Sequence, residues 1–370
     1  MLTAQEFAAW FRLLETPGVG RGTARRLLSA CGSPSGVFAA PPAALRGLLD
    51  AATAQALGNW PPEFETRLKA AQSWLAGGPE RHALVLGDPA YPPLLLQTAD
   101  PPLLLYVQGA LDPLSKPGVA MVGSRRASPQ GLANAKAFAQ ALSDQGWVVF
   151  SGLAQGIDAA AHEGALAGAA GTVAVVGTGL DRVYPARHRD LAHRIAAHGA
   201  LVSEFAPGTP PLPEHFPMRN RLIAGMSLGT VVVEAALQSG SLITARLASE
   251  AGRDVFAVPG SIHAPQSKGC HWLLKQGAKL VESAQDILEE LQPGRTRSTQ
   301  LPLPEFDSDA QDPAPHPVLD ALGHDPVTLD ALISRTGYPG HELSALLMTL
   351  ELDGQVARLP GGLYQRVHRG

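Results

Sequence analysis

Short apolar runs alternate with amphipathic stretches between about residues 118 and 291. The apolar runs predict buried strands at 119–122, 148–150, 172–176, 201–203, 230–233, 255–258 and 280–281. Stretches with helical spacing fall between most of them, at 130–142, 157–167, 187–197, 242–251 and 269–276. Buried strands separated by helices are typical of a doubly wound parallel sheet, which binds ligands at the carboxyl ends of its strands. We therefore predict an α/β domain over residues 80–292.

The chain before this region has the pattern of a small helical domain, residues 1–78. An apolar stripe recurs there at helical spacing, formed by Phe7, Trp10, Phe11 and Leu14. A Pro-Gly-Val-Gly turn at 17–20 then leads into another helix, as in a helix-hairpin-helix or an ordinary tight turn in a SAM-like helical unit. Arg21, Arg25 and Arg26 would contact a DNA phosphate in the first case and solvent in the second. A single such hairpin favours the tight turn.

Prolines change the pattern on both sides of the predicted sheet. Prolines at 89, 92, 93, 101 and 102 break any long helix and leave a short extended piece at 103–107. Prolines and acidic residues dominate residues 293–315, a composition that cannot bury a core and predicts a flexible linker.

The last segment, residues 316–370, has the order of a winged helix. Thr328 can cap a helix at 329–336, a second helix follows at 341–352, and strands at 356–358 and 363–365 form a hairpin. The second helix carries Glu342 and Glu351 but no lysine or arginine. A helix that reads DNA would present cations or amides, so this composition favours a protein contact or a structural role.

Composition excludes several classes of protein. The 370 residues are 45% hydrophobic with a formal charge of −4, so the chain is no generally basic nucleic-acid coat, although a local basic face is allowed. Cys31 and Cys270 form no disulfide framework and no zinc pattern, and we expect neither metal nor cofactor. No secretory signal and no apolar run of membrane length is visible, which predicts a cytoplasmic protein without a membrane partner.

Turns rich in glycine or serine follow the predicted strands, at 123–124, 151–156, 177–179, 239–241 and 260–261. Such turns can cradle an anion with backbone N–H groups, and Arg125, Arg219, Arg221 and Lys268 lie in or near them. Phe216 adds an aromatic ring just before Arg219-Asn220-Arg221. Cations, a ring and a helix that starts at Ser241 suit an anionic ligand with flat bases.

Catalytic motifs are few. The chain has no Gly-x-Gly-x-x-Gly fingerprint, no Walker A sequence, no Gly-x-Ser-x-Gly elbow and no reactive cysteine setting. Glu234 follows a predicted strand. It is either the acid/base of a nucleoside-monophosphate glycosidase or, as we favour, the ion-pair partner of one of the arginines at the strand-end turns, which we call rim arginines. Asp158 and His162 lie one helical turn apart and could act as an acid/base pair. We favour a structural role, in which Asp158 caps or orients the first turn of a helix and His162 packs against it or bonds it.

The order of these motifs resembles the DNA-processing protein DprA family, also called Smf. The resemblance covers about residues 80–290 and includes Tyr184-Pro185. Its other motifs are GSRRAS at 123–128, SGLAQGIDAAAH at 151–162, VGTG at 176–179, FPMRNR at 216–221, QSGS at 238–241 and VPGS at 258–261. The flanking segments are similar to the helical and winged-helix-like modules of some members.

The resemblance implies a non-catalytic protein whose extended Rossmann domain binds single-stranded DNA, protects incoming DNA and loads the recombinase RecA on it during natural transformation. It implies a homodimer through residues 271–280, with His271, Leu274 and Leu280 at the interface. Ser124 and Arg125 would hold a phosphate and Phe216 would stack on a base. The family motifs, together with nearby positive charges, predict the following DNA-binding residues: Gly123, Ser124, Arg125, Arg126, Ser151, Gly152, Gly156, Arg187, Phe216, Arg219, Asn220, Arg221, Ser239, Gly240, Ser241 and Lys268.

One position departs from the family pattern. Members often carry a lysine three residues before the aromatic residue, where this chain has Pro213. One phosphate contact is therefore missing from the motif, and Arg187 or Lys268 would have to replace it.

Overall fold

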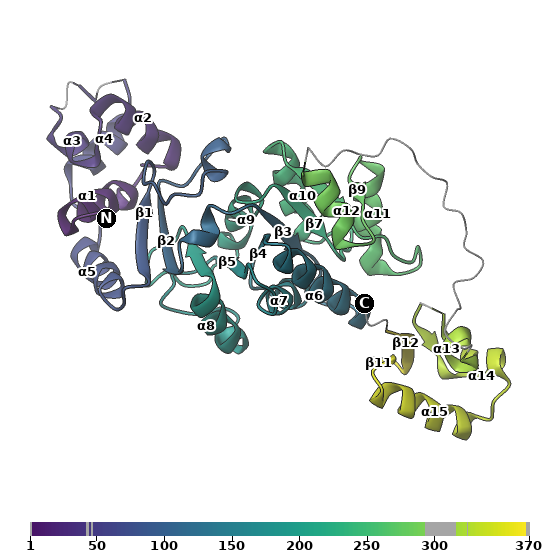
Figure 1. The fold of residues 1–370 in the computed structure, drawn as a ribbon. Helices are drawn as coiled ribbons and strands as arrows, with labels where there is room; N and C mark the ends of the chain where they lie inside the picture. Colours follow the sequence, from purple (N-terminus) through teal and green to yellow (C-terminus); the bar gives the residue numbers. More distant parts are fainter. Residues whose placement is uncertain (1, 42–43, 46, 293–315, 324, 368–370) are drawn as a thin grey trace.

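The computed structural model describes residues 2–41, 44–45, 47–292, 316–323 and 325–367 (Figure 1). Its largest element is one sheet with the strand order β1-β2-β6-β5-β4-β3-β7-β8-β9. The strands are β1 Arg81–Val85, β2 Leu104–Gly109, β3 Gly118–Val122, β4 Val148–Ser151, β5 Thr172–Val175, β6 Ala200–Ser203, β7 Gly229–Val232, β8 Asp254–Ala257 and β9 Lys279–Leu280. Strands β3 to β9 run parallel to one another, as predicted.

The sheet is mixed rather than wholly parallel. Strand β2 pairs antiparallel with both β1 and β6, which adds a hairpin at one edge. Strand β1 was not predicted, because Arg81 and His82 make its first half polar. The sheet's order reverses at β3, which lies between β4 and β7. Such a switch point leaves a crevice at the carboxyl ends of the strands.

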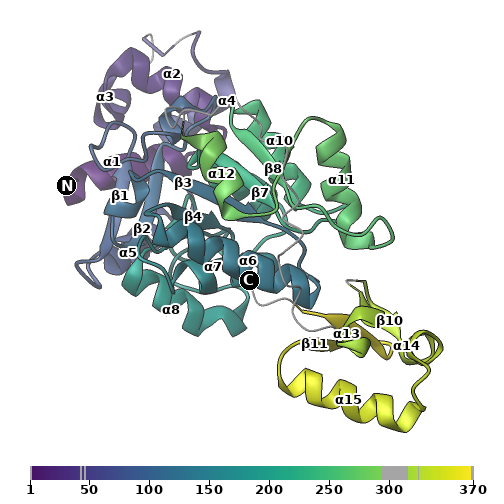
Figure 2. The same cartoon turned by 45° about the vertical axis from the view of Figure 1, so that its right-hand side comes forward.

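Helices cover both faces of the sheet, because side chains alternate along each buried strand. On β3, Ala120 and Val122 pack on one face with α9 (His215–Gly225), α10 (Ser241–Glu250) and α11 (Lys268–Lys275). Val119 and Met121 pack on the other face with α6 (Pro129–Asp144), α7 (Ile157–Ala165) and α12 (Ala284–Leu291). Figures 1 and 2 show α6 and α7 side by side. This part of the chain also contains α8, Arg189–His198. None of the described helices combines the length and apolar character that a membrane crossing needs.

The N-terminal segment is helical, as predicted, and packs against the hairpin edge of the sheet. Its helices are α1 Ala4–Glu15, α2 Arg21–Cys31, α3 Pro34–Ala39, α4 Ala51–Gly58 and α5 Phe64–Leu75. Phe7 and Trp74 meet the ring of Tyr106 on β2 edge-on, with centroids 6.4 and 6.0 Å away. The helical unit therefore shares part of its apolar core with the sheet.

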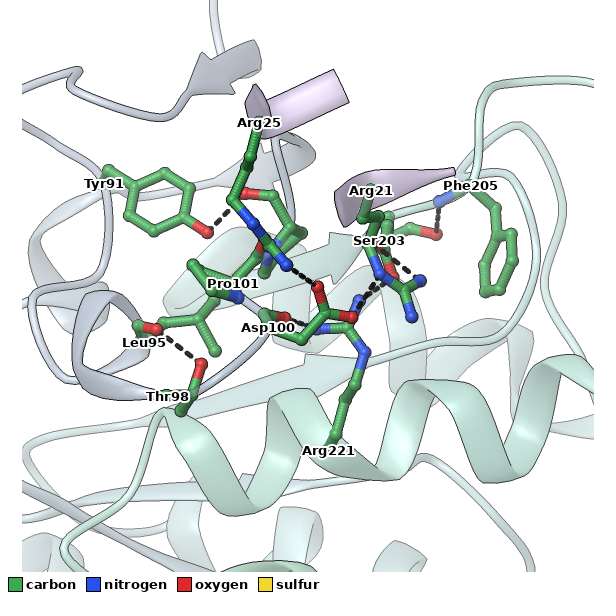
Figure 3. A network of polar contacts seen from close by, with 12 residues as sticks. Arg21, Arg25, Tyr91, Leu95, Thr98, Asp100, Pro101, Ser203, Phe205 and Arg221 are labelled. Carbon is green, nitrogen blue, oxygen red and sulfur yellow. Dashed lines mark hydrogen bonds and ion pairs between the residues drawn. The ribbon is translucent and has the colours of Figure 1, made fainter. Parts of the chain in front are cut away.

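A network of arginines and carboxylates joins α2 to α9 (Figure 3). Asp100 accepts hydrogen bonds of 2.5 Å from both Arg21 and Arg25. Arg221 of α9 donates to the Asp100 carbonyl oxygen at 2.6 Å and pairs with Glu204. The prediction that the α2 arginines lie in solvent is wrong for Arg21 and Arg25, which fasten the N-terminal helices to the sheet domain.

The C-terminal segment has its own apolar core and the predicted winged-helix order. Its elements are α13 Pro317–Leu322, β10 Val327–Thr328, α14 Leu329–Thr336, α15 Gly340–Leu352, β11 Val356–Leu359 and β12 Leu363–Arg366. Thr328 caps α14 as predicted, by accepting a hydrogen bond of 3.2 Å from the N–H of Ala331. The predicted linker, residues 293–315, lies outside the described residues.

Candidate functional site

An open pocket of about 820 Å³ lies at the switch point of the sheet. Its walls come from the turn after β3, the first half of α9 and the turn between β7 and α10. The structure brings together here these predicted site residues: Gly123, Ser124, Arg125, Arg126, Phe216, Arg219, Asn220, Ser239, Gly240 and Ser241. Pro213, where the expected lysine is missing, also lines the pocket.

A cation and two aromatic rings form one side of the pocket. The guanidinium carbon of the exposed Arg125 lies 6.0 Å from the centroid of the Phe216 ring. Phe216 in turn packs on Tyr184, with centroids 5.5 Å apart and planes inclined by 39°. Tyr184 is 49% exposed, so its ring offers apolar surface to a ligand. Sequence reasoning left Tyr184 out of the site, although it lies in a quoted motif, because it is distant from Phe216 in the chain.

The turn after β3 is held in place by its own backbone. The Ser124 N–H donates to the carbonyl oxygen of Glu234 at 2.7 Å, and the Ser124 carbonyl accepts from the Ile157 N–H at 3.2 Å. The Ser124 hydroxyl accepts from the Arg126 N–H at 3.0 Å. Gly156 is needed beside this turn, because a Cβ there would lie 2.2 Å from the Ser124 carbonyl oxygen. Gly156 therefore supports the turn from outside the pocket.

The start of α10 forms another side of the pocket. Its N-cap, Gly240, supplies no side-chain acceptor, and the neighbouring hydroxyls of Ser239 and Ser241 are hydrogen-bonded to each other at 2.7 Å. A helix start of this kind favours a negatively charged group, because the helix dipole and its first N–H groups point there. Gln238 and Gln266 add amides to this side, and sequence reasoning had included neither in the site.

Arg219 lies in the floor of the pocket rather than on its rim. Its side chain is buried, and Nη1 donates to the carbonyl oxygen of Gly152 at 2.6 Å and to that of Val175. Burial lowers the pKa of Arg219 to about 10, so it stays charged at neutral pH. Asp158 is buried nearby and accepts from the N–H groups of Gly152 and Ala154 at 3.2 and 3.3 Å. Burial raises the pKa of Asp158, while the charge of Arg219 acts in the opposite direction.

Other predicted residues lie elsewhere. Arg221, a predicted DNA-binding residue, is directed to Asp100 and Glu204 and does not line the pocket. The Ser151 hydroxyl is buried and donates to the Met121 carbonyl at 2.6 Å, so it cannot face a ligand. Gly152 is packed between Arg219 and Asp158, where a Cβ would lie 2.6 Å from the guanidinium. Arg187 bonds Gln155, and Lys268 is exposed at the start of α11; neither lines the pocket.

Glu234 does not pair with a rim arginine, contrary to the prediction. Its carboxylate accepts from the Ser128 N–H at 2.9 Å and from the Ser128 hydroxyl at 2.5 Å. That hydroxyl also accepts from the Gly131 N–H and so caps α6. Burial raises the pKa of Glu234, but the carboxyl group is part of a helix cap and does not line the pocket.

The pair of Asp158 and His162 also has a structural role. Asp158 orients the turn before α7 rather than the predicted first turn of the helix. His162 bonds Thr172 of β5 through Nδ1 at 2.8 Å instead of the first turn of its own helix. Burial lowers the pKa of His162 to about 3, so the imidazole is neutral at physiological pH.

Comparison with known proteins identifies relatives over most of the chain. The family model described as DNA recombination-mediator protein A matches residues 82–292, and that of the DprA winged helix domain matches residues 302–362. Protein Smf of Escherichia coli K12 is 46% identical over 295 residues, which cover 79% of each chain. DNA processing protein DprA of Streptococcus pneumoniae R6 is 49% identical over 205 residues, 55% of this chain and 72% of that protein.

Two solved structures are similar as well. The X-ray structure of Streptococcus pneumoniae DprA has a TM-score of 0.64 and 39% identity, and the match covers 79% of this chain and 99% of that one. A Helicobacter pylori DNA processing protein A, solved to explain its single-stranded DNA binding mode, has a TM-score of 0.53 and 30% identity. That match covers 57% of this chain and 95% of the other.

Proposed function

This chain belongs to the DNA recombination-mediator protein A family, known as DprA or Smf, and on that premise we propose that its switch-point pocket binds single-stranded DNA. The observation that carries the proposal is the position of Arg125 beside the paired rings of Phe216 and Tyr184. A backbone phosphate needs a cation and an unpaired base needs a flat apolar face, and both lie within one pocket.

The chemistry around this trio fits the same ligand. Arg126 is a second exposed cation in the pocket, and the start of α10 also lines it. The amides of Asn220, Gln238 and Gln266 can donate to or accept from bases and sugars. The Helicobacter pylori relative binds single-stranded DNA, which supports extending that property to this chain.

We propose further that the protein is not an enzyme. The carboxylates of Glu234 and Asp158 are engaged in capping and turn contacts, which leaves neither free for acid/base work. Protection of incoming DNA and loading of RecA are the roles that family membership supports. A glycosidase acting on nucleoside monophosphates is the alternative, favoured by the raised pKa of Glu234. Release of free base, abolished in Glu234→Gln, would establish that alternative.

A homodimer through residues 271–280 is part of the proposal. Leu280 is 53% exposed and Trp272, within the same segment, is 46% exposed. His271 bonds the Gly260 carbonyl oxygen at 2.9 Å, and Leu274 packs partly into the core, so Leu280 offers more apolar surface than either. Leu280→Asp should shift the protein from dimer to monomer in light scattering, and an unchanged mass would contradict the interface.

We also propose that the chain is organised as residues 1–78, 80–292, 293–315 and 316–370. The separate apolar core of the last segment supports this division. The core shared by α1, α5 and β2 means that the first two units fold against each other.

Fluorescence anisotropy of a labelled oligonucleotide at increasing salt tests the DNA-binding proposal. Arg125→Ala should weaken binding and reduce the slope of log affinity against log salt by about 0.7, the value for one phosphate contact on a single strand. Arg246→Ala removes an exposed arginine that pairs with Glu250 outside the pocket, and it should leave the slope unchanged. Equal behaviour of the two variants would refute the site. Double-stranded DNA and RNA probes measure its selectivity.

A further inference from the structure

A second hollow of about 540 Å³ adjoins the pocket on the side of α6 and α7. Arg125 and Arg126 line both cavities and so form the ridge between them. The rest of the hollow comes from the first half of α6, from α7 and from the turns before these helices. The two helices pack closely, since a Cβ at Gly164 would lie 2.1 Å from the Lys136 carbonyl oxygen. None of the DNA-binding motifs includes the α6 face of this hollow.

The charge of the hollow is positive. Lys136 is exposed on α6 and joins the two ridge arginines around the cavity. Glu163 is the acidic residue that lines it, and its carboxylate is held by Arg194 of α8. Gln155, also in the lining, is bonded to Arg187, which places another cation at the edge. Among the described side chains, the cations therefore outnumber the acids here.

The floor of the hollow is apolar and shallow. Leu132 is 38% exposed, and Ala133, Ala159 and Ala160 bring only methyl groups to the surface. Small side chains on two adjacent helices leave a smooth surface on which a planar base can lie. A volume of 540 Å³ falls within the roughly 300–1,000 Å³ typical of ligand pockets, so the hollow can hold a nucleotide.

We propose that single-stranded DNA leaving the switch-point pocket crosses the Arg125–Arg126 ridge and continues into the α6–α7 hollow. Lys136 contacts a phosphate there, and Leu132 contacts a base. This inference rests on the proposed function of the switch-point pocket and extends it by naming the path of the strand. Continuity of the two cavities at shared arginines favours one ligand that spans both over a separate protein partner.

The test uses the full chain and two labelled oligonucleotides of about 4 and about 16 nucleotides, which bracket the site sizes of single-strand-binding folds. Lys136→Ala should leave the affinity for the short probe unchanged. For the long probe it should lower the affinity and reduce the salt slope by about 0.7, the value for one phosphate contact. Lys136→Arg should restore both values. Lys69→Ala removes an exposed lysine from α5, away from the hollow, and serves as the matched control.

Phe216→Ala separates failure of this inference from failure of the proposed function, because Phe216 lines the first pocket only. If Phe216→Ala binds both probes more weakly while Lys136→Ala binds them as the Lys69→Ala control does, the inference is overturned but the proposed function stands. Loss of short-probe affinity in Lys136→Ala also overturns it, since Lys136 would then belong to the first pocket. No effect of Phe216→Ala on either probe contradicts the proposed function itself.

Discussion

Arg219 of α9 donates a hydrogen bond of 2.6 Å to the carbonyl oxygen of Gly152, the residue that follows β4. The same guanidinium bonds the Val175 carbonyl at the end of β5. One buried arginine thus ties the helix that carries Phe216 to the ends of two strands. This bond determines where the aromatic side of the pocket lies relative to the turn after β3.

Replacement of Arg219 by methionine should destabilise the protein by about 3 kcal/mol or more, because it leaves Asp158 buried without its nearby cation. The change should be measured as the free energy of unfolding in urea. Asn220→Ala is the matched neighbour on the same helix and should leave stability nearly unchanged while weakening DNA binding. If Arg219→Met were as stable as Asn220→Ala, the arginine would not hold the floor of the pocket.

Tyr184→Ala should weaken binding of single-stranded DNA by about 1–3 kcal/mol, the range for loss of one base-stacking contact. The ring of Tyr184 packs on Phe216 and is half exposed, so removing it takes away part of the stacking surface. Titration calorimetry with an oligonucleotide measures the loss. Trp60 is 65% exposed and does not line the pocket, so Trp60→Ala should bind normally. Unaltered affinity in Tyr184→Ala would remove Tyr184 from the site.

Asp100→Asn should loosen α2 from the sheet domain, because one carboxylate accepts from both Arg21 and Arg25. Burial opposes ionisation of Asp100, but the hydrogen bonds from Arg25 and Arg21 outweigh it and hold its pKa below the ordinary value. The stabilisation is therefore present above the ordinary aspartate pKa and is lost as the pH falls through the lowered pKa.

Hydrogen exchange of the α2 amides tests the role of Asp100. Exchange should be faster in Asp100→Asn than in Asp112→Asn, which removes an exposed pair with Lys116. Because Arg221 of α9 joins the same network, DNA affinity of the variant also shows whether the N-terminal helices influence the pocket. Equal exchange in the two variants would mean that Asp100 does not fasten α2.

His162 should make the protein less stable in mild acid. Its pKa is lowered from 6.5 to about 3 by burial, so below pH 6.5 the unfolded chain takes up a proton that the folded chain refuses. The free energy of unfolding should then fall by up to about 1.4 kcal/mol per pH unit from this residue alone.

Urea unfolding between about pH 7.5 and about pH 5 measures this effect. His162→Gln should lower stability at neutral pH, because the bond to Thr172 is altered, but it should flatten the pH dependence. His193→Gln, an exposed histidine on α8, should keep the pH dependence of the original chain. A steep pH dependence that persists in His162→Gln would assign it to other groups.

Periodicity was sufficient to predict much of the architecture. The alternation of buried strands with amphipathic helices predicted the sheet from β3 to β9, because strand and helix periods depend on local chain geometry. The turns at 123–124, 151–156, 177–179 and 260–261 lie at strand ends as predicted, whereas 239–241 lies at the start of α10, beyond the end of β7. The switch point brings the turn after β3 and the start of α9 into one pocket. Periodicity did not predict the hairpin of β1 and β2 at the edge of the sheet, because the polar Arg81 and His82 interrupt the apolar pattern of β1.

The roles of the two arginines on α9 depended on the helix that carries them. Two residues apart on a helix of 3.6 residues per turn, Arg219 and Arg221 point about 200° apart. Once 215–225 is helical, Arg219 at i+3 and Asn220 at i+4 lie on the Phe216 side of the helix, whereas Arg221 points away from it. Motif reading alone gave both arginines the same role, because it considered their order and not their direction.

The sequence by itself determined the α/β class, the family resemblance and ten of the residues that line the pocket, because these follow from local periods and contiguous motifs. Tertiary structure decided which charged side chains remain free to contact a ligand in the pocket. Three of them form hydrogen bonds with residues distant in the chain: Arg219 with Gly152, Arg221 with Asp100 and Glu234 with Ser128. Arg125 stays exposed beside Phe216. Partners of this kind depend on how strands and helices pack, and no local pattern records that packing.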